Sequence, residues 1–375
     1  MKIFVTGDNH IGLKFNRYPQ VKDKLIESRY DSMEKMVKTA EDEQCDIFVI
    51  TGDLFERINA SKKEVERVVN ILAKFNGDVF VLPGNHDYYT GEEQVWMYFN
   101  EAVSKCNNNI KLITEMKEFT VDIDDQTVGI YPAFCQSKHS GQNNLDWIKG
   151  MDINVSRFNI GIAHGNIDGV SPDMTDNYFN MEKDELYKIP VDVWLMGHAH
   201  ISYPELPVDR YVTGHKIFNP GTHEQTDLSN NTEGCAFIIS LEMNNGEKTV
   251  SARRVITGNV RFYDIHVDVN AEMGLGGSIE NALKDIENKE NSVLRLTLSG
   301  AVNADEYYNR SDIYESTLDG YMDHECVDSE LSELITKEKI RDEFPEISFA
   351  AQLLESLDDP KEVQMAYELI KACRQ

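Results

Sequence analysis

Five short motifs built on aspartate, asparagine and histidine accompany apolar, strand-like runs in the first 200 residues. In chain order they are Gly7-Asp8-Asn9-His10, Gly52-Asp53, Gly84-Asn85-His86-Asp87, His164-Gly165 and Gly197-His198-Ala199-His200. The pattern delivers oxygen and imidazole ligands to the ends of several strands, so the fold has to bring those strand ends to one place. These residue types are those of a two-metal hydrolytic centre.

The first hundred residues alternate strand and helix, which predicts a parallel sheet with right-handed crossovers. Within this stretch Ser61 is a plausible N-cap, because Glu64 stands at the capping-box offset. The predicted strands are Lys2–Gly7, Cys45–Gly52 and Asp78–Pro83, and the predicted helices are 22–44, a stretch behind Ser61, and 92–105.

From about residue 110 the pattern changes to short strands separated by turn signals. We expect an α/β fold in which two sheets pack face to face as a sandwich, with helices outside. The strand candidates are 110–113, 119–123, 127–131, 158–163, 191–196, 211–220, 235–243 and 248–256.

A domain boundary is expected near residue 260, after a first domain of residues 1–260. Residues 261–345 predict a small α+β module with a strand at 262–269, a loop at 274–277, a helix at 279–290 and a strand at 292–299. Residues 346–375 predict a helical tail that breaks at Asp358-Asp359-Pro360.

Composition places the chain among soluble, cytoplasmic proteins. No apolar run approaches the roughly 18 residues that span a bilayer, and the six cysteines are scattered without a CxxC pair, as in reduced thiols. The net charge of −28 argues against a uniformly basic nucleic-acid-binding surface. The acid is concentrated at the C-terminus, where residues 301–375 hold 19 acidic and 7 basic residues.

The motifs also predict roles for single residues. Because side chains alternate along a strand, Asp8 and His10 can project to one side, and so can His198 and His200. Asp53 is the natural anionic bridge between two metals. Two ions about 3.5–4 Å apart can clamp a phosphate and stabilise both attacking and leaving oxygens, which predicts phosphoester hydrolysis.

Asn85 offers a neutral carbonyl oxygen to a metal. His86 follows it but should point elsewhere, which suits transition-state stabilisation or general-acid work. His215 and His223 are expected to be ordinary surface or packed histidines.

The ordered motifs resemble the calcineurin-like metallophosphoesterases. GDNHIG, TGDLFE, LPGNHD and the run VDVWLMGHAH followed by NPGTHEQTD resemble the SbcD-type DNA exonuclease subunits within that superfamily. The resemblance covers about residues 1–260. By position and size, the 261–345 module corresponds to the capping domain of that family, and the tail to the segment that binds the SMC-like ATPase SbcC.

Carried over by motif, the resemblance implies two manganese ions. One would be held by Asp8, His10, Asp53 and His200, and the other by Asp53, Asn85, His164 and His198, with His86 acting on the scissile phosphodiester. It also implies a DNA exonuclease or endonuclease that acts with the ATPase in double-strand-break repair or end processing. A homodimer is implied as well, with helices between the first two motifs and near 92–105 as candidate interfaces.

Substrate contacts and substrate class stay open. Lys14 and Arg17 are candidates for contacts to a DNA backbone, Arg57 for a phosphate, and Tyr88 for stacking on a base. The ordinary interpretation of the lysine and the two arginines is a solvated surface charge, and that of the tyrosine is a ring packed against other side chains. The acidic surface motivates an alternative function, a phosphomonoesterase or small-molecule phosphodiesterase on the same core. A non-catalytic scaffold is the third hypothesis, and the complete ligand set speaks against it.

Overall fold

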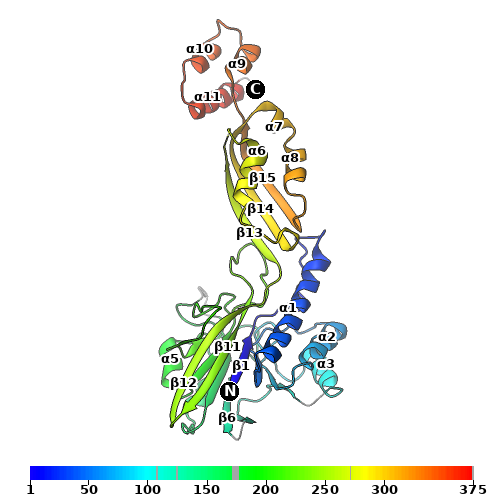
Figure 1. Ribbon diagram of the computed structural model, residues 1–375, viewed down its shortest axis with the longest axis vertical. Helices are drawn as coiled ribbons and strands as arrows, with labels where there is room; N and C mark the ends of the chain where they lie inside the picture. Colours follow the sequence, from blue (N-terminus) through cyan, green and yellow to red (C-terminus); the bar gives the residue numbers. More distant parts are fainter. Residues whose placement is uncertain (107–108, 124–125, 171–176, 271, 374–375) are drawn as a thin grey trace. The chain divides into compact units, whose positions relative to one another are not determined.

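The computed structural model describes residues 1–106, 109–123, 126–170, 177–270 and 272–373. The chain divides into two compact units, Met1–Arg261 and Phe262–Gln375 (Figure 1). The five motifs all belong to the first unit.

A seven-stranded sheet forms the centre of the first unit. Its first four strands are parallel to one another, whereas β11 runs antiparallel to both β1 and β12. The predicted parallel arrangement of the N-terminal strands is therefore confirmed. In spatial order the strands are β4 (Ile110–Leu112), β3 (Asp78–Val81), β2 (Ile47–Ile50), β1 (Lys2–Thr6), β11 (Cys235–Asn244), β12 (Glu247–Ile256) and β9 (Val212–Thr213).

Three helices cover one face of this sheet, as Figure 1 shows for α1, α2 and α3 beside β1. They are α1 (Lys22–Asp42), α2 (Lys62–Leu72) and α3 (Gln94–Val103). Their buried apolar stripes form one core cluster with side chains of β1, β2 and β3. The predicted capping box before α2 is present, with both the Ser61 and Glu64 side chains engaged.

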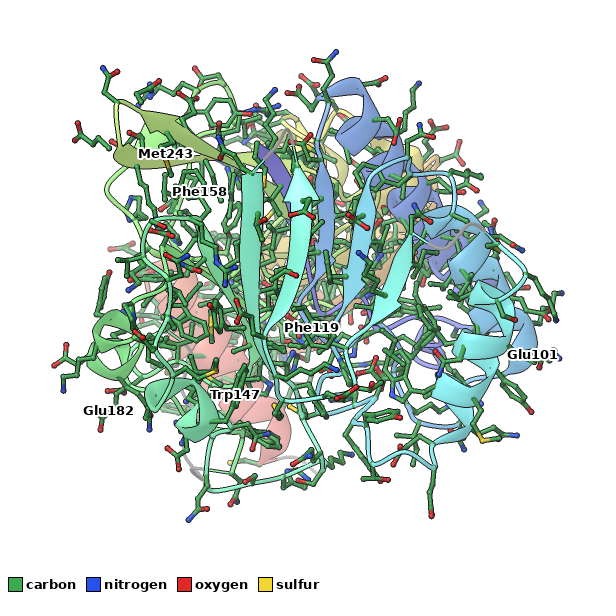
Figure 2. All side chains as sticks on the ribbon, turned by 90° about the horizontal axis from the view of Figure 1, so that it is seen from below. Glu101, Phe119, Trp147, Phe158, Glu182 and Met243 are labelled. Atoms are coloured by element: carbon green, nitrogen blue, oxygen red, sulfur yellow. The ribbon has the colours of Figure 1, made fainter. Side chains whose placement is uncertain are left out.

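A five-stranded sheet packs against the other face. Apolar side chains from both sheets fill the space between them, together with Phe158 just before β7, which Figure 2 labels. The outer face of the second sheet packs with α4 (Asp146–Lys149) and α5 (Lys183–Lys188). The strand order is β10 (Ile217–Phe218), β8 (Val193–Gly197), β7 (Asn159–His164), β6 (Gln126–Ala133) and β5 (Phe119–Ile123).

The two-sheet α/β sandwich matches the predicted fold class. The single strand predicted at 211–220 is wrong, because this stretch forms two short strands, β9 and β10, in different sheets. Gly214, at φ +92°, lies between them, where the chain turns from one sheet to the other.

The second unit contains a three-stranded sheet, β13 (Arg261–Val269), β14 (Ser292–Val302) and β15 (Asp323–Glu333). The predicted loop at 274–277 is wrong, because these residues are the first turn of α6 (Gly274–Leu283). Leu275, Ile279 and Leu283 pack into the core of this sheet, and that packing outweighs the low helix propensity of three glycines. The remaining helices beside it are α7 (Ala304–Tyr308) and α8 (Arg310–Thr317).

Three further helices follow, α9 (Lys337–Glu343), α10 (Phe349–Glu355) and α11 (Pro360–Ala372). The helix break predicted at 358–360 is present. The three helices share a small core that includes Ile340, Leu354 and Tyr367. The domain boundary expected after residue 345 stays a prediction. The core that the three helices share already includes α9, which lies before that boundary.

Across the described residues, no helix combines the length and apolarity that crossing a lipid bilayer requires. All six cysteines are free thiols.

Candidate metal centre

The five motifs meet because each follows or closes a strand that ends at the same side of the sandwich. β1, β2 and β3 are parallel and end just before the first three motifs. β7 and β8 are parallel in the second sheet, and they end at His164 and Gly197. The carboxyl ends of both sheets thus deliver the predicted ligands to one place, as parallel strands do in many α/β sites.

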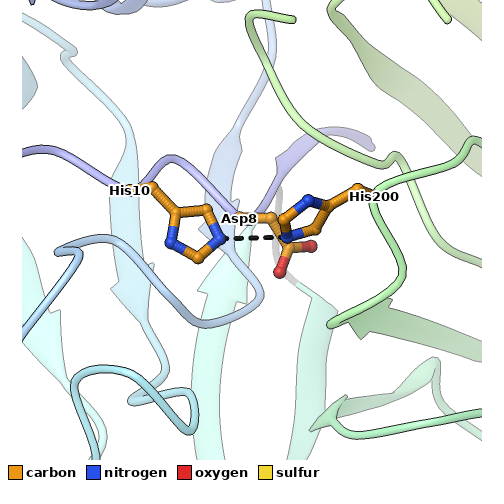
Figure 3. Close-up of side chains that lie close together, drawn as sticks. All are labelled: Asp8, His10 and His200. Atoms are coloured by element: carbon orange, nitrogen blue, oxygen red, sulfur yellow. Dashed lines mark hydrogen bonds between the residues drawn. The ribbon is translucent and has the colours of Figure 1, made fainter. Parts of the chain in front are cut away.

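Asp8, His10 and His200 form the first set of ligand atoms (Figure 3). His10 Nε2 lies 3.1 Å from His200 Nε2, and Asp8 offers a carboxylate oxygen within 4.8 Å of both rings. The fourth predicted member, Asp53, places Oδ2 3.9 Å from His10 Nε2.

Asn85, His164 and His198 form the second set. Asn85 Oδ1 lies 3.0 Å from His164 Nε2 and 3.1 Å from His198 Nδ1. Asp53 Oδ2 is 3.4 Å from His164 Nε2. One oxygen of Asp53 is therefore within 4 Å of an imidazole from each set, the position that a bridging ligand occupies.

The predicted alternation along a strand is not what positions these side chains. Their positions depend on backbone turns beyond the strand ends. β1 ends at Thr6, and Asp8 and His10 adopt left-handed conformations with φ of 49° and 44°. Asp53 and His198 also have positive φ, at 50° and 104°. Non-glycine residues rarely adopt this region, and clusters of such residues are typical of functional sites.

The ligand residues are buried except for His198 and His200, which are half-buried, and their charges act on one another. Burial raises the pKa of Asp8 to about 8. Burial also acts to raise the pKa of Asp53, but the charge and hydrogen bond of His164 outweigh it and hold that pKa below its usual range. Burial acts to lower the pKa of His164, and the Asp53 carboxylate raises it instead to about 9. Burial lowers the pKa of His200 to about 3, leaving that imidazole neutral at pH 7.

This donor set fits divalent transition-metal ions. Buried carboxylates need compensating positive charge, and two imidazole nitrogens that face each other at 3.1 Å can both serve as ligands of one cation. Asp8, His10, Asp53 and His200 would hold one ion, and Asp53, Asn85, His164 and His198 the other.

His86 lies beside the first set. Its backbone N–H donates to Asp53 Oδ1 at 2.8 Å, and its ring packs edge-on against His10. The ring is only partly buried and lines an open cavity of about 380 Å³. His86 is thus anchored to a ligand by its backbone while its imidazole faces the space where a substrate would enter. Around the ring, the cavity is lined by His10, Leu13, Glu56, His200, Ile201, Thr226, Asp227, Ser229 and Asn230.

Glu56 is a functional candidate that the sequence prediction missed. Its carboxylate lies 2.9 Å from His10 Nδ1, and its backbone oxygen lies 3.2 Å from His86 Nδ1. Burial acts to raise the pKa of Glu56, but the hydrogen bond and charge of His10 outweigh it and lower that pKa. An ionised Glu56 favours the proton on His10 Nδ1, which leaves Nε2 free for a metal. The signal was present as the last residue of TGDLFE.

Asp87 was also missed as a structural anchor. It is fully buried, and its two oxygens accept hydrogen bonds from the N–H groups of Gly84 and Phe55 at 2.7 and 2.9 Å. These bonds join the third motif to the segment just after the second.

The four predicted substrate contacts lie outside the described lining of the cavity. Lys14 and Arg17 are exposed, two to five residues after Gly12. Arg57 is half-buried and donates to the Gly12 carbonyl at 3.3 Å. Tyr88 is partly buried and packs against the apolar cluster on the outer face of the second sheet.

The two histidines predicted to be ordinary fit that interpretation. His215 is exposed, whereas His223 is fully buried with Nε2 3.0 Å from the Arg29 carbonyl.

With this geometry in place, comparisons with known proteins identify relatives. Residues 1–202 match the family described as calcineurin-like phosphoesterase. The chain is 28% identical over 185 residues to the uncharacterized metallophosphoesterase YhaO of Bacillus subtilis. The matched stretch covers 47% of this chain and 42% of YhaO. It is 29% identical over 75 residues to the double-strand break repair protein MRE11 of Encephalitozoon cuniculi. That match covers 20% of this chain and 12% of the MRE11 protein.

The chain thus spans less than half of the length of the curated relatives that it matches. Among solved structures, the calcineurin-like phosphoesterase YfkN of Bacillus subtilis aligns with 76% of this chain and 95% of its own, at 14% identity and a TM-score of 0.41.

Proposed function

We propose a manganese-dependent DNA nuclease function, of the SbcD type, for this chain, which belongs to the calcineurin-like phosphoesterase family. Family membership makes it a metal-dependent phosphoester hydrolase. The observation that carries the proposal is the pair of ligand sets that share Asp53, with the His86 imidazole beside them in an open cavity. When bound, two metal ions would supply Lewis-acid activation of the phosphoester and of water.

The residues of the chain supply the rest of the chemistry. His86, held by its backbone to Asp53 and by its ring to the Glu56 carbonyl, is placed to stabilise the phosphoryl oxygens or to give a proton to the leaving oxygen. Asn230 donates to the His200 carbonyl at 2.9 Å and so ties the far wall of the cavity to a ligand.

The cavity lining favours a phosphodiester over a phosphomonoester. The lining residues in the described part of the chain include the acids Glu56 and Asp227 and no lysine or arginine. A phosphomonoester carries nearly two negative charges at neutral pH, whereas a diester carries one, so the acidic wall penalises the monoester more. The short similarity to MRE11, named as a repair protein, supports DNA as the diester. A small-molecule phosphodiesterase is the remaining alternative.

An SMC-like ATPase is the proposed partner, bound through the C-terminal helices. Ile347, Phe349, Met365 and Leu369 are each more than 60% exposed on or beside α10 and α11. Apolar side chains that stay exposed outside the small core of these helices are typical of an interface. A homodimer through α1 and α3 is also proposed, since Met97 on α3 is 62% exposed.

The decisive experiment compares substrates under one set of conditions. Purified protein with Mn²⁺ is given single- and double-stranded DNA, a nitrophenyl phosphodiester and a nitrophenyl phosphomonoester. We expect DNA cleavage that His86→Ala slows about 10²- to 10⁴-fold. Activity on small esters alone, even after addition of the ATPase, would refute the DNA assignment and favour the alternative.

A further inference from the structure

A cluster of buried polar side chains lies behind the first metal motif. It joins α1 to the loop after β10 and to the segment that precedes the second unit. We call it the buried polar cluster. Its members are Ser28, Arg29, Ser32, His223, Glu224, Thr257 and Asn259.

Arg29 connects this cluster to the first metal motif. Its guanidinium donates two hydrogen bonds to the Asn9 carbonyl, from Nη2 at 2.5 Å and from Nε at 3.1 Å. Asn9 stands between Asp8 and His10, the two ligands with left-handed backbone. Because this turn is strained and Asn9 is fully buried, its carbonyl needs a strong donor to hold the turn in place.

Arg29 is itself 1% exposed, and the charges of Glu224 and Glu56 both act to keep it protonated. Burial lowers the pKa of Arg29 to about 10, so it keeps its proton at neutral pH. The Glu224 carboxylate also accepts hydrogen bonds from the backbone N–H groups of Asn259 at 3.0 Å and Val260 at 2.7 Å. Ser28 and Ser32 of α1 donate to the same carboxylate.

The remaining contacts reinforce this arrangement. The Thr257 hydroxyl donates to the His223 carbonyl at 2.6 Å, and the Asn259 amide donates to the Ser32 hydroxyl at 3.0 Å. Two residues beyond Glu224, the same loop lines the cavity with Thr226 and Asp227. One buried carboxylate therefore contacts the Asn259–Val260 segment and, through Ser28 and Ser32, the helix that carries Arg29.

We propose that Arg29 and Glu224 are positioning residues that couple the Asn259–Val260 segment to the Asp8–His10 metal motif. The inference rests on the proposed metal site but not on the nature of the substrate. Ordering of the motif by metal then stabilises the hydrogen bonds at Asn259 and Val260, and disturbance of that segment weakens metal binding, because such coupling is reciprocal.

Hydrogen exchange of the full chain, with and without Mn²⁺, tests the coupling. We expect saturating Mn²⁺ to slow exchange in peptides that cover residues 257–261. In Glu224→Gln the protection should disappear, and the affinity for Mn²⁺ by calorimetry should fall about tenfold, the lower end for loss of a supporting residue. Glu242→Gln, an exposed acid on β11, is the matched control and should behave as wild type.

If Glu224→Gln does not fold, hydrogen exchange of the wild-type chain with and without Mn²⁺ can still overturn the inference. Mn²⁺ that raises the melting temperature yet leaves exchange at 257–261 unchanged would contradict the coupling. A purely structural role for Glu224 predicts a lower melting temperature with unchanged Mn²⁺ affinity, which also refutes it. A chain that shows the coupling but cuts no DNA overturns only the proposed function, whereas failure to bind Mn²⁺ at all overturns both.

Discussion

The Glu56 carboxylate should set the affinity of the first metal position. In the structure it lies 2.9 Å from His10 Nδ1 and its side chain is 28% exposed. A hydrogen bond to a charged group contributes about 1.5–3 kcal/mol, against about 0.5–1.5 kcal/mol for a neutral one. Glu56→Gln keeps the shape and an acceptor oxygen but loses the charge, so it should cost about 1–1.5 kcal/mol.

That free energy corresponds to about tenfold weaker binding, at about 1.4 kcal/mol per factor of ten. Glu56→Ala loses the acceptor as well and should approach the roughly 100-fold loss seen for supporting residues of metal sites. The backbone carbonyl that contacts His86 Nδ1 survives in both variants. The rate at saturating metal should therefore stay close to that of the wild type.

Calorimetric titration with Mn²⁺ measures the affinity, and a phosphodiester assay at saturating Mn²⁺ measures the rate. Glu92→Gln, an exposed acid a few residues beyond the third motif, is the control for removing one negative charge. Affinities within twofold of wild type for both Glu56 variants would refute the reasoning. So would a loss of rate at saturating metal without a loss of affinity.

Three other outcomes are expected. His86→Ala should lower the rate about 10²- to 10⁴-fold, the range for a lost acid–base group, while calorimetry still finds two metals; weakened metal binding would instead make His86 a ligand. Asp53→Asn should bind fewer than two metals, because the shared anion is gone, and a stoichiometry of two would disprove the bridge. Mn²⁺ at 100 times its Kd should raise the free energy of unfolding by about 2.7 kcal/mol, and chelation should reverse this in a denaturant titration; an unchanged midpoint would contradict a metal site in the folded chain.

The centre of the first unit was predictable because strands such as β1, β2 and β7 are rich in apolar residues and largely buried. Runs such as Ile47–Ile50 are short, rich in β-branched residues and followed by a glycine turn, which favours a buried strand over a helix. The second unit was harder. β15 reads DHECVDSELSE, in which Leu331 is the only aliphatic side chain that reaches full burial, so no alternation signals a strand. α6 begins in a glycine run that by local propensity indicates a loop.

For the site, the types of ligand were predictable, since each motif is local in sequence. Their projection was not, because the left-handed backbone at Asp8 and His10 depends on hydrogen bonds to Gly52 and Asp53, more than forty residues away. Arg29 was invisible for the same reason. On a helix it looks like an ordinary solvated arginine, and only the packing of α1 behind the first motif buries it.

The acidic charge of the chain bears on how the proposed nuclease would engage DNA. Residues 262–375 hold 26 acidic and 10 basic residues, whereas residues 1–261 hold 39 and 27, so the second unit carries more than half of the net charge. Screening limits the reach of those acids to about 8 Å at physiological salt. At the ligand sets, two divalent ions would outweigh the nearby carboxylates at contact distance, where they act directly on a phosphate. Attraction would then come from the metal centre and from a partner subunit rather than from a broad basic surface, which reconciles a polyanionic substrate with a net charge of −28.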